Sequence, residues 1–260
     1  MNFNIISPIT RLNEYATLSR SHLVLQHILH ADYAEFYRKR KLIEGDFLIL
    51  DNGAYEGARM PTLDEYRHNI NFYRPDVCVL PDYLLQPWGK TFNAATRFLD
   101  DISGTTGEYE PQWLYIPQAE PGRLEDWNRS LEQILNDARV TWIGIPRALS
   151  THIARDRLAR VEAARHIRRV YPSIHMHAFG MVDGDIHELP YLEDAGVESV
   201  DSSAPVWRGW LGYSLTEQRD MKHWRTVGRE CNFWANVLPR AYEHKMILHN
   251  LEACGVNTGR

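Results

Sequence analysis

The sequence predicts an α/β fold, a single-domain (β/α)8 TIM barrel in which eight parallel strands alternate with helices. Three observations support this prediction. The chain has 260 residues, of which 44% are hydrophobic and 24% charged, the size and composition of a single-domain barrel. Short apolar runs recur eight times, and segments with helical spacing lie between them. The runs are continuous rather than alternating, as expected for parallel strands that are covered on both faces.

The predicted elements follow the chain in a regular order. Strands are expected over residues 3–7, 22–25, 46–50, 77–80, 113–116, 141–145, 174–178 and 198–200. Helical spacing of apolar residues is found over 63–73, 123–138 and 151–170. Further helices are predicted over 215–237 and 239–254, so the barrel covers about residues 1–214 and a helical C-terminal extension about 215–260. A doubly wound open sheet is the alternative, but no G-x-G-x-x-G motif follows the first strand and no Walker loop is present.

Composition narrows the class of protein. The first residues are too short and uncharged for a signal peptide, and no apolar run has the length of a membrane helix. Cys78, Cys231 and Cys254 form no CxxC pair, so we expect free thiols, no structural zinc subdomain and a cytoplasmic location. The net charge of −5 excludes a globally basic surface for nucleic acid, although arginines crowd residues 155–169. No cofactor, metal or membrane partner is expected.

Polar residues follow the predicted strands at the end where barrel enzymes carry their chemistry. Three of them are acids, which is more than a generic scaffold needs, although an Asp before Asn52-Gly53 is also a common turn former. The residues at these strand ends are Asp51, Asp82, Gln118, Gly144, Arg147, the segment 177–181 and Asp201.

Six short motifs at these strand ends resemble, in order, the active-site motifs of the tRNA-guanine transglycosylase superfamily. The six motifs occur in the same order as in that superfamily and cover most of the barrel. They are Asp51-Asn52-Gly53-Ala54-Tyr55, Pro81-Asp82-Tyr83, Ile116-Pro117-Gln118, Ile143-Gly144-Ile145-Pro146, His177-Ala178-Phe179-Gly180-Met181 and Val200-Asp201-Ser202-Ser203.

The resemblance implies that guanine in a nucleic acid is exchanged for a 7-deazaguanine base. By motif position, Asp201 would be the nucleophile and Asp51 the general acid and base. Asp82, Gln118 and the backbone at Gly144 would bind the purine edge, and Tyr55 and Met181 would sandwich the base. Base exchange with retained stereochemistry requires a carboxylate that forms a covalent sugar intermediate and a second carboxyl that moves the proton.

DNA is the favoured substrate. Relatives that act on tRNA carry a Cys-rich zinc site after the last strand, and the spacing of Cys231, His249 and Cys254 does not match it. The compact chain is similar to the short phage enzymes that modify genomic DNA and so protect it from host nucleases. Trp207, Arg208 and Arg147 are then the candidates for nucleic-acid contact.

Three other functions fit some of the same residues. A tRNA-directed enzyme would use the same chemistry on another polymer, and a glycosidase or nucleosidase would use Asp51 and Asp201 to transfer the sugar to water. A metal-dependent hydrolase would use His175, His177 and Asp201 as ligands. A binding module without catalysis is the fourth possibility, and the three intact acids argue against it.

Overall fold

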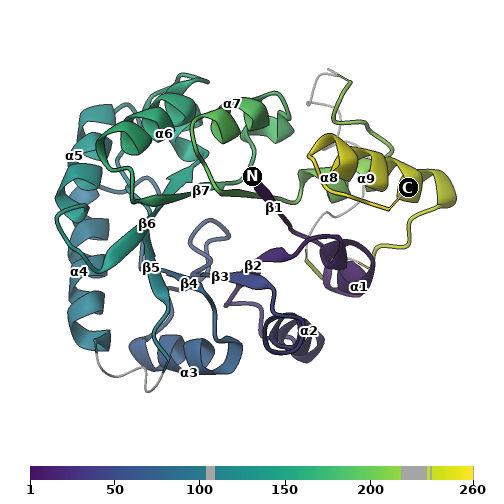
Figure 1. Ribbon diagram of the computed structural model, residues 1–260, viewed down its shortest axis with the longest axis horizontal. Helices are drawn as coiled ribbons and strands as arrows, with labels where there is room; N and C mark the ends of the chain where they lie inside the picture. The colour runs from purple at the N-terminus through teal and green to yellow at the C-terminus, as the bar shows by residue number, and fades with distance from the viewer. Residues whose placement is uncertain (104–108, 218–232, 235, 260) are drawn as a thin grey trace.

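The computed structural model describes residues 1–103, 109–217, 233–234 and 236–259, and it has the predicted architecture. Eight parallel strands form one sheet in the order β1-β8-β7-β6-β5-β4-β3-β2, and helices surround it (Figure 1). β1 and β2 stand at the two ends of this order, so the barrel is nearly closed. The Ser19 hydroxyl, just before β2, spans the opening by donating to the Phe3 carbonyl of β1 over 2.8 Å.

All eight predicted strands are confirmed, and no end shifts by more than two residues. They are β1 Asn2–Ile5, β2 Ser21–Leu25, β3 Phe47–Asp51, β4 Val77–Val79, β5 Gln112–Tyr115, β6 Val140–Pro146, β7 His175–Phe179 and β8 Ser199–Ser202. β3 and β8 extend through Asp51 and Asp201, so these two acids are strand residues rather than loop residues. A strand fixes the direction of its side chains more firmly than a loop does, which suits a catalytic position.

Helices cover the outside of the sheet. They are α1 Leu12–Tyr15, α2 Ala31–Leu42, α3 Leu63–Tyr73, α4 Trp88–Ile102, α5 Leu124–Ile134, α6 Ala159–Val170, α7 Glu188–Asp194, α8 Ala204–Trp210 and α9 Ala241–Ala253. α3 has the predicted bounds and begins with a capping box between Thr62 and Glu65.

The predicted helix over 151–170 is wrong in its first half. A π-helical turn, Leu149–Ile153, comes first, and the chain then breaks before α6 begins at Ala159. Arg155 lies at the break with a left-handed φ of 56°. The Asp156 carboxylate accepts the Leu158 backbone N–H over 2.9 Å, which favours a turn over a continuous helix. The apolar periodicity was therefore correct only from residue 159 onward.

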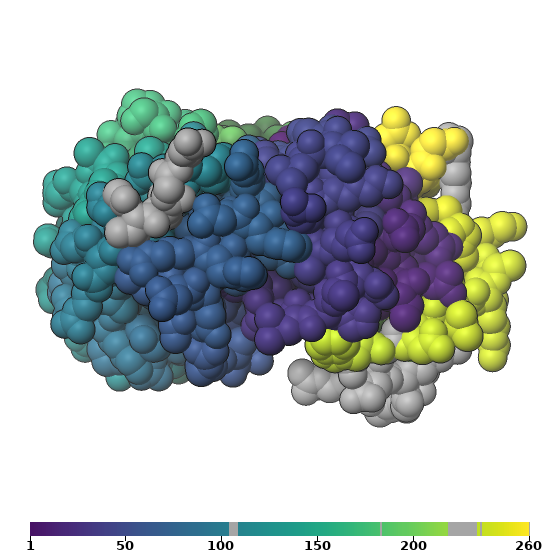
Figure 2. Space-filling view, turned by 90° about the horizontal axis from the view of Figure 1, so that it is seen from below, coloured from purple at the N-terminus to yellow at the C-terminus, as the bar shows by residue number. Residues whose placement is uncertain are grey.

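The predicted helix over 215–237 is not found in the described residues of that range, which are 215–217, 233–234 and 236–237. The Leu215 N–H donates to the Asn250 side chain over 2.8 Å, and residues 218–232 and 235 of the predicted helix lie outside the described residues. The predicted helix over 239–254 is confirmed as α9. It lies against α8 and near α1 (Figure 1), and the C-terminal segment adjoins the N-terminal one on the surface (Figure 2). Tyr15 and His244 join the two segments through a 3.0 Å hydrogen bond.

None of the helices in the described ranges is both long enough and apolar enough to cross a membrane.

The contact between α8 and α9 generates a stability prediction. A Cβ atom at Gly209 would lie 2.5 Å from the backbone N and Cα of Ile247, where nothing flexible can move aside. Gly209→Ala should therefore lower the free energy of unfolding by about 1–3 kcal/mol, the usual effect of overpacking. Chemical denaturation measures this difference. Gly89→Ala is the control, because a Cβ atom there meets nothing within 4 Å and alanine favours the helix. Equal stability of the two variants would contradict the prediction.

Candidate active site

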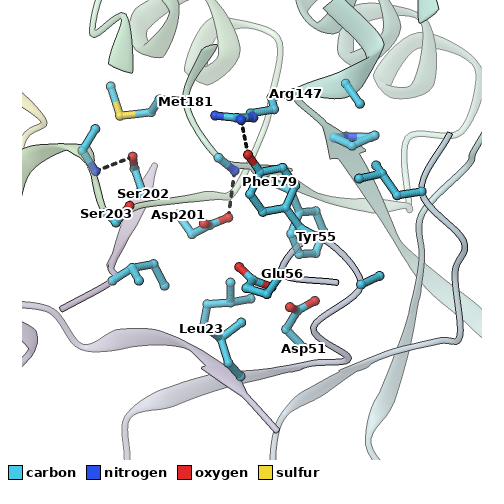
Figure 3. Close-up of a pocket in the computed structure, with 18 of the residues that line it drawn as sticks. Leu23, Asp51, Tyr55, Glu56, Arg147, Phe179, Met181, Asp201, Ser202 and Ser203 are labelled. Carbon is cyan, nitrogen blue, oxygen red and sulfur yellow. Dashed lines mark hydrogen bonds between the residues drawn. The ribbon is translucent and has the colours of Figure 1, made fainter. Parts of the chain in front are cut away.

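A cavity of about 910 Å³ lies at the carboxyl ends of the strands, where a barrel enzyme has its active site. Figure 3 shows that the Asp51, Glu56 and Asp201 side chains from different elements point toward this common space. The predicted site residues that line it are Asp51, Tyr55, Asp82, Gln118, Arg147, Met181, Asp201, Trp207 and Arg208. Closure of the barrel thus brings together residues that are as much as 157 positions apart in the sequence, from Asp51 to Arg208.

Gly144 is the predicted site residue that is not part of this lining. It lies within β6, and an added Cβ atom would be 2.5 Å from the Phe179 ring. The absence of a side chain at Gly144 therefore makes room for Phe179, which does line the cavity. The geometry gives Gly144 a packing role inside the barrel.

Asp201 is held in a defined orientation at the end of β8. Its Oδ1 accepts the Gly180 backbone N–H over 3.0 Å and is 3.2 Å from Nε2 of His177. Oδ2 makes no hydrogen bond with the described residues. One oxygen is thus fixed by the neighbouring strand, and the other is free to face the cavity (Figure 3).

His177 is a buried residue of the barrel interior. Its Nδ1 lies 2.7 Å from the Ser199 hydroxyl, and its Nε2 contacts Asp201, so both ring nitrogens are engaged. His175, two residues earlier, stacks on Trp142 and contacts Glu198 at the opposite end of the strand. Among the described residues, no three His, Cys, Asp or Glu side chains are placed to hold a metal ion. The two histidines therefore belong to separate contacts, and His177 serves as a partner of Asp201.

Asp82 lies between two side-chain amides. Its Oδ1 accepts a 2.8 Å hydrogen bond from Asn52, and its Oδ2 accepts a 2.7 Å hydrogen bond from Gln118. Burial raises the pKa of Asp82 to about 6, and these two hydrogen bonds oppose a larger rise. The carboxylate is thus mostly ionised at neutral pH and keeps further lone pairs for a ligand.

Asp51 has the most strongly perturbed environment of the acids. Burial, followed by the nearby charges of Glu56, Asp82 and Asp201, raises its pKa well above the usual range. The hydrogen bond that its Oδ2 accepts from the Gly53 N–H, over 3.1 Å, only partly opposes these effects. A carboxyl group of this kind can hold a proton near neutral pH and transfer it, as a general acid requires.

Glu56 adds a fourth acid to the cavity. The Glu56 side chain is exposed to solvent, yet the surrounding protein displaces part of its water. This desolvation is the main reason that its pKa is raised to about 7. The charges of Asp201 and Asp82 act in the same direction. The sequence motif placed Glu56 beside Tyr55 without indicating that its side chain would join the other carboxyl groups.

The far side of the cavity is cationic and aromatic. The Arg147 guanidinium lies 4.7 Å from the centre of the Tyr55 ring, and it also donates a hydrogen bond to the Tyr55 hydroxyl. Trp207 and Arg208 reach the cavity from α8, directly after β8. Met181 is buried in the wall after β7. Flat and polarisable side chains of these types suit a heterocyclic ligand.

Arg160 supports the site from behind, and sequence reasoning missed it. In the sequence it is one of the arginines that crowd residues 155–169, but in the structure Arg160 is fully buried. It donates to the Gly180 carbonyl over 2.9 Å and pairs with Glu188 over 3.3 Å. Arg160 thereby fixes the residue whose N–H holds Asp201. The signal in the sequence is helical spacing, because Arg160 lies four residues before Ala164 and seven before Ile167 and so shares their buried face.

Neither a scan against protein-family models nor a search of the curated proteins found a match for this chain.

The raised pKa of Glu56 predicts a pH-dependent stability. The unfolded carboxyl ionises near pH 4.5 and the folded one near pH 7, so the folded state binds more protons between these values. The contribution of protonated Glu56 to the free energy of unfolding is fully present below about pH 4.5 and is lost as the pH rises through about 7. Glu56→Gln should therefore raise the melting temperature relative to the original protein more at about pH 8 than at about pH 5.

Thermal unfolding at the two pH values measures this effect. Glu65→Gln is the control, because the Arg59 ion pair holds the pKa of Glu65 at about 2 and the group stays charged across the range. Its effect on the melting temperature should be the same at both pH values. A Glu56→Gln effect that is also independent of pH would show that Glu56 ionises normally.

Proposed function

We propose that this protein is a base-exchange transglycosylase that replaces guanine in DNA with a 7-deazaguanine derivative. The observation that carries the proposal is the pairing of two differently held acids in one cavity. Asp201 is fixed through one oxygen and presents the other, and Asp51 lies in surroundings that favour a bound proton. A nucleophile and an acid with separate environments are what base exchange with retention requires. The six-motif resemblance assigns the same roles to the same residues.

In the proposed reaction, Oδ2 of Asp201 attacks the anomeric carbon of the target nucleotide. The bond from that carbon to the guanine nitrogen breaks, and guanine leaves with the proton of Asp51. The incoming deazaguanine returns a proton to Asp51 and attacks the same carbon. This step breaks the aspartyl-sugar bond, restores both carboxyl groups and retains the stereochemistry through two inversions. The target nucleotide must leave the base stack to reach the cavity.

Asp82 and Gln118 are the proposed base-recognition pair. The ionised carboxylate accepts from the N–H groups of the purine edge, and the amide complements the purine carbonyl. Each side chain is already held by protein contacts, since the Gln118 oxygen accepts the Leu85 N–H over 3.3 Å. A site that is organised before the ligand arrives loses less entropy on binding. DNA is preferred to tRNA because the sequence does not match the zinc-site spacing of the tRNA-directed relatives.

A base-exchange assay tests the proposal. The purified protein is incubated with labelled guanine, or with cyano-, aminomethyl- or amido-substituted 7-deazaguanine, and with duplex DNA, single-stranded DNA or tRNA. The nucleic acid is then digested and its nucleosides are identified by mass. Deazaguanine nucleosides in DNA support the proposal, and incorporation into tRNA alone would overturn the choice of polymer. Release of guanine without incorporation would identify a nucleosidase instead.

Asp201→Asn should abolish exchange, by at least about a thousandfold, because it removes the nucleophile with almost no change in volume. The rate of deazaguanine incorporation measures the loss, and the melting temperature verifies the fold. The variant should still bind the free base. Incorporation at the original rate would show that another group attacks the sugar.

Asp82→Ala should weaken binding of the free deazaguanine base by roughly tenfold to a hundredfold, the usual effect of losing a charge-assisted hydrogen bond. Calorimetric titration of the base measures the affinity, with Asp201→Asn as the variant of unchanged affinity. If the two variants bound the base equally well, Asp82 would be a structural acid that holds Asn52 and Gln118.

A further inference from the structure

A second cavity, of about 650 Å³, opens beside the catalytic one where β6 leads into the π-helical turn and α6. Arg147, Thr151 and His152 line both cavities, so the two spaces share a wall. Arg155 and Arg157 line the second cavity alone. The catalytic cavity gathers acids, whereas this neighbouring one gathers guanidinium groups, and none of the described side chains that line it is a carboxylate.

The three arginines of this cavity carry more positive charge than their partners neutralise. Arg157 forms an ion pair with Asp185. Arg147 contacts the neutral Tyr55 ring and hydroxyl, which leave its charge in place. Arg155 is exposed and makes no hydrogen bond or ion pair with any residue that the structure describes. Two guanidinium charges therefore remain for an anion, which would also find the Thr151 hydroxyl in the wall.

The backbone also places Arg155 in an unusual way. Its φ of 56° is left-handed, a conformation that disfavours any residue with a Cβ atom. The strained residue ends the segment that begins with the π-helical turn, and turns of that kind recur at functional sites. A strained residue with a charged side chain on the rim of a cavity is a candidate ligand-binding position.

We propose that this cavity binds a backbone phosphate of the nucleic-acid strand whose base enters the catalytic cavity; this inference rests on the proposed function. The sugar that reacts at Asp201 is joined directly to phosphates, so its phosphate site must adjoin the catalytic cavity. Arginine is suited to that role, because its planar group donates two parallel hydrogen bonds to phosphate oxygens. Arg155 and Arg147 are the proposed phosphate ligands, and Arg157 is oriented by Asp185 at the edge.

Binding of DNA in the absence of a deazaguanine base tests this site separately from catalysis. The probe is a short fluorescein-labelled single-stranded DNA with one guanine, and its anisotropy is titrated at several salt concentrations. Arg155→Gln should weaken binding by roughly tenfold for any sequence and reduce the salt slope by about one. Arg165→Gln is the matched control, since Arg165 lies exposed on α6 and pairs with Glu162. Equal affinity of the two variants would overturn the proposal.

A second variant separates binding from folding. Arg155→Gly tolerates the left-handed backbone, so it should keep the melting temperature of the original protein while it weakens DNA binding like Arg155→Gln. Competition with inorganic phosphate distinguishes the source of the anion. If Arg155→Gln lowered the affinity for inorganic phosphate but left DNA binding unchanged, the site would hold a free anion and the proposed strand contact would be wrong.

The two proposals fail in different ways. Binding of DNA that depends on Arg155, without any base exchange, would support the phosphate site and contradict the transglycosylase. Base exchange at an equal rate and an equal DNA affinity in Arg155→Gln would support the transglycosylase and contradict the phosphate site.

Discussion

Burial of several carboxyl groups at the barrel mouth is the constraint on which the site depends. Closing eight parallel strands collects Asp51, Asp82 and Asp201 at one end, and the loop after β3 adds Glu56. Burial makes a buried charge costly and raises the pKa of Asp51 well above the usual range, and the charges of Glu56, Asp82 and Asp201 act in the same direction. Asp82 accepts hydrogen bonds from two side-chain amides, and Asp201 accepts one from the backbone N–H of Gly180. The surrounding strands thus differentiate acids that a sequence presents as equivalent.

The fold was predictable because its signals are local. Each buried strand leaves a short apolar run, and a chain of alternating strands and helices has few ways to fold. The strand ends then located Asp51, Asp82, Gln118 and Asp201, because parallel strands in a barrel place their carboxyl ends together. Gly144 had the same signal, yet it serves the packing of Phe179. The position of a residue at a strand end therefore predicts that it lies near the site more reliably than it predicts what the residue does there.

The features of the site that the sequence did not predict depend on contacts between distant segments, and such contacts leave little trace in the sequence. His177 matched a metal-ligand spacing, but its direction and its partners come from β8. Arg160 seemed one of many arginines on α6, and its burial depends on carbonyl groups of β6 and β7 and on α7. The break at Arg155 was hidden because the apolar spacing continues through it. In each case a tertiary hydrogen bond or a strained backbone overrides the local preference.

Segregation of charge reconciles a net charge of −5 with a proposed nucleic-acid substrate. The acids lie inside the larger cavity, where burial raises the pKa values of Asp51, Glu56 and Asp82 and where a base, not a phosphate, is proposed to enter. The guanidinium groups of Arg147 and Arg155 lie in the adjoining wall, outside that cluster. A strand bound in this way meets a positive surface with its backbone and an acidic pocket with its extruded base. The same division would orient a bound strand, because the acids would repel a phosphate placed in their cavity.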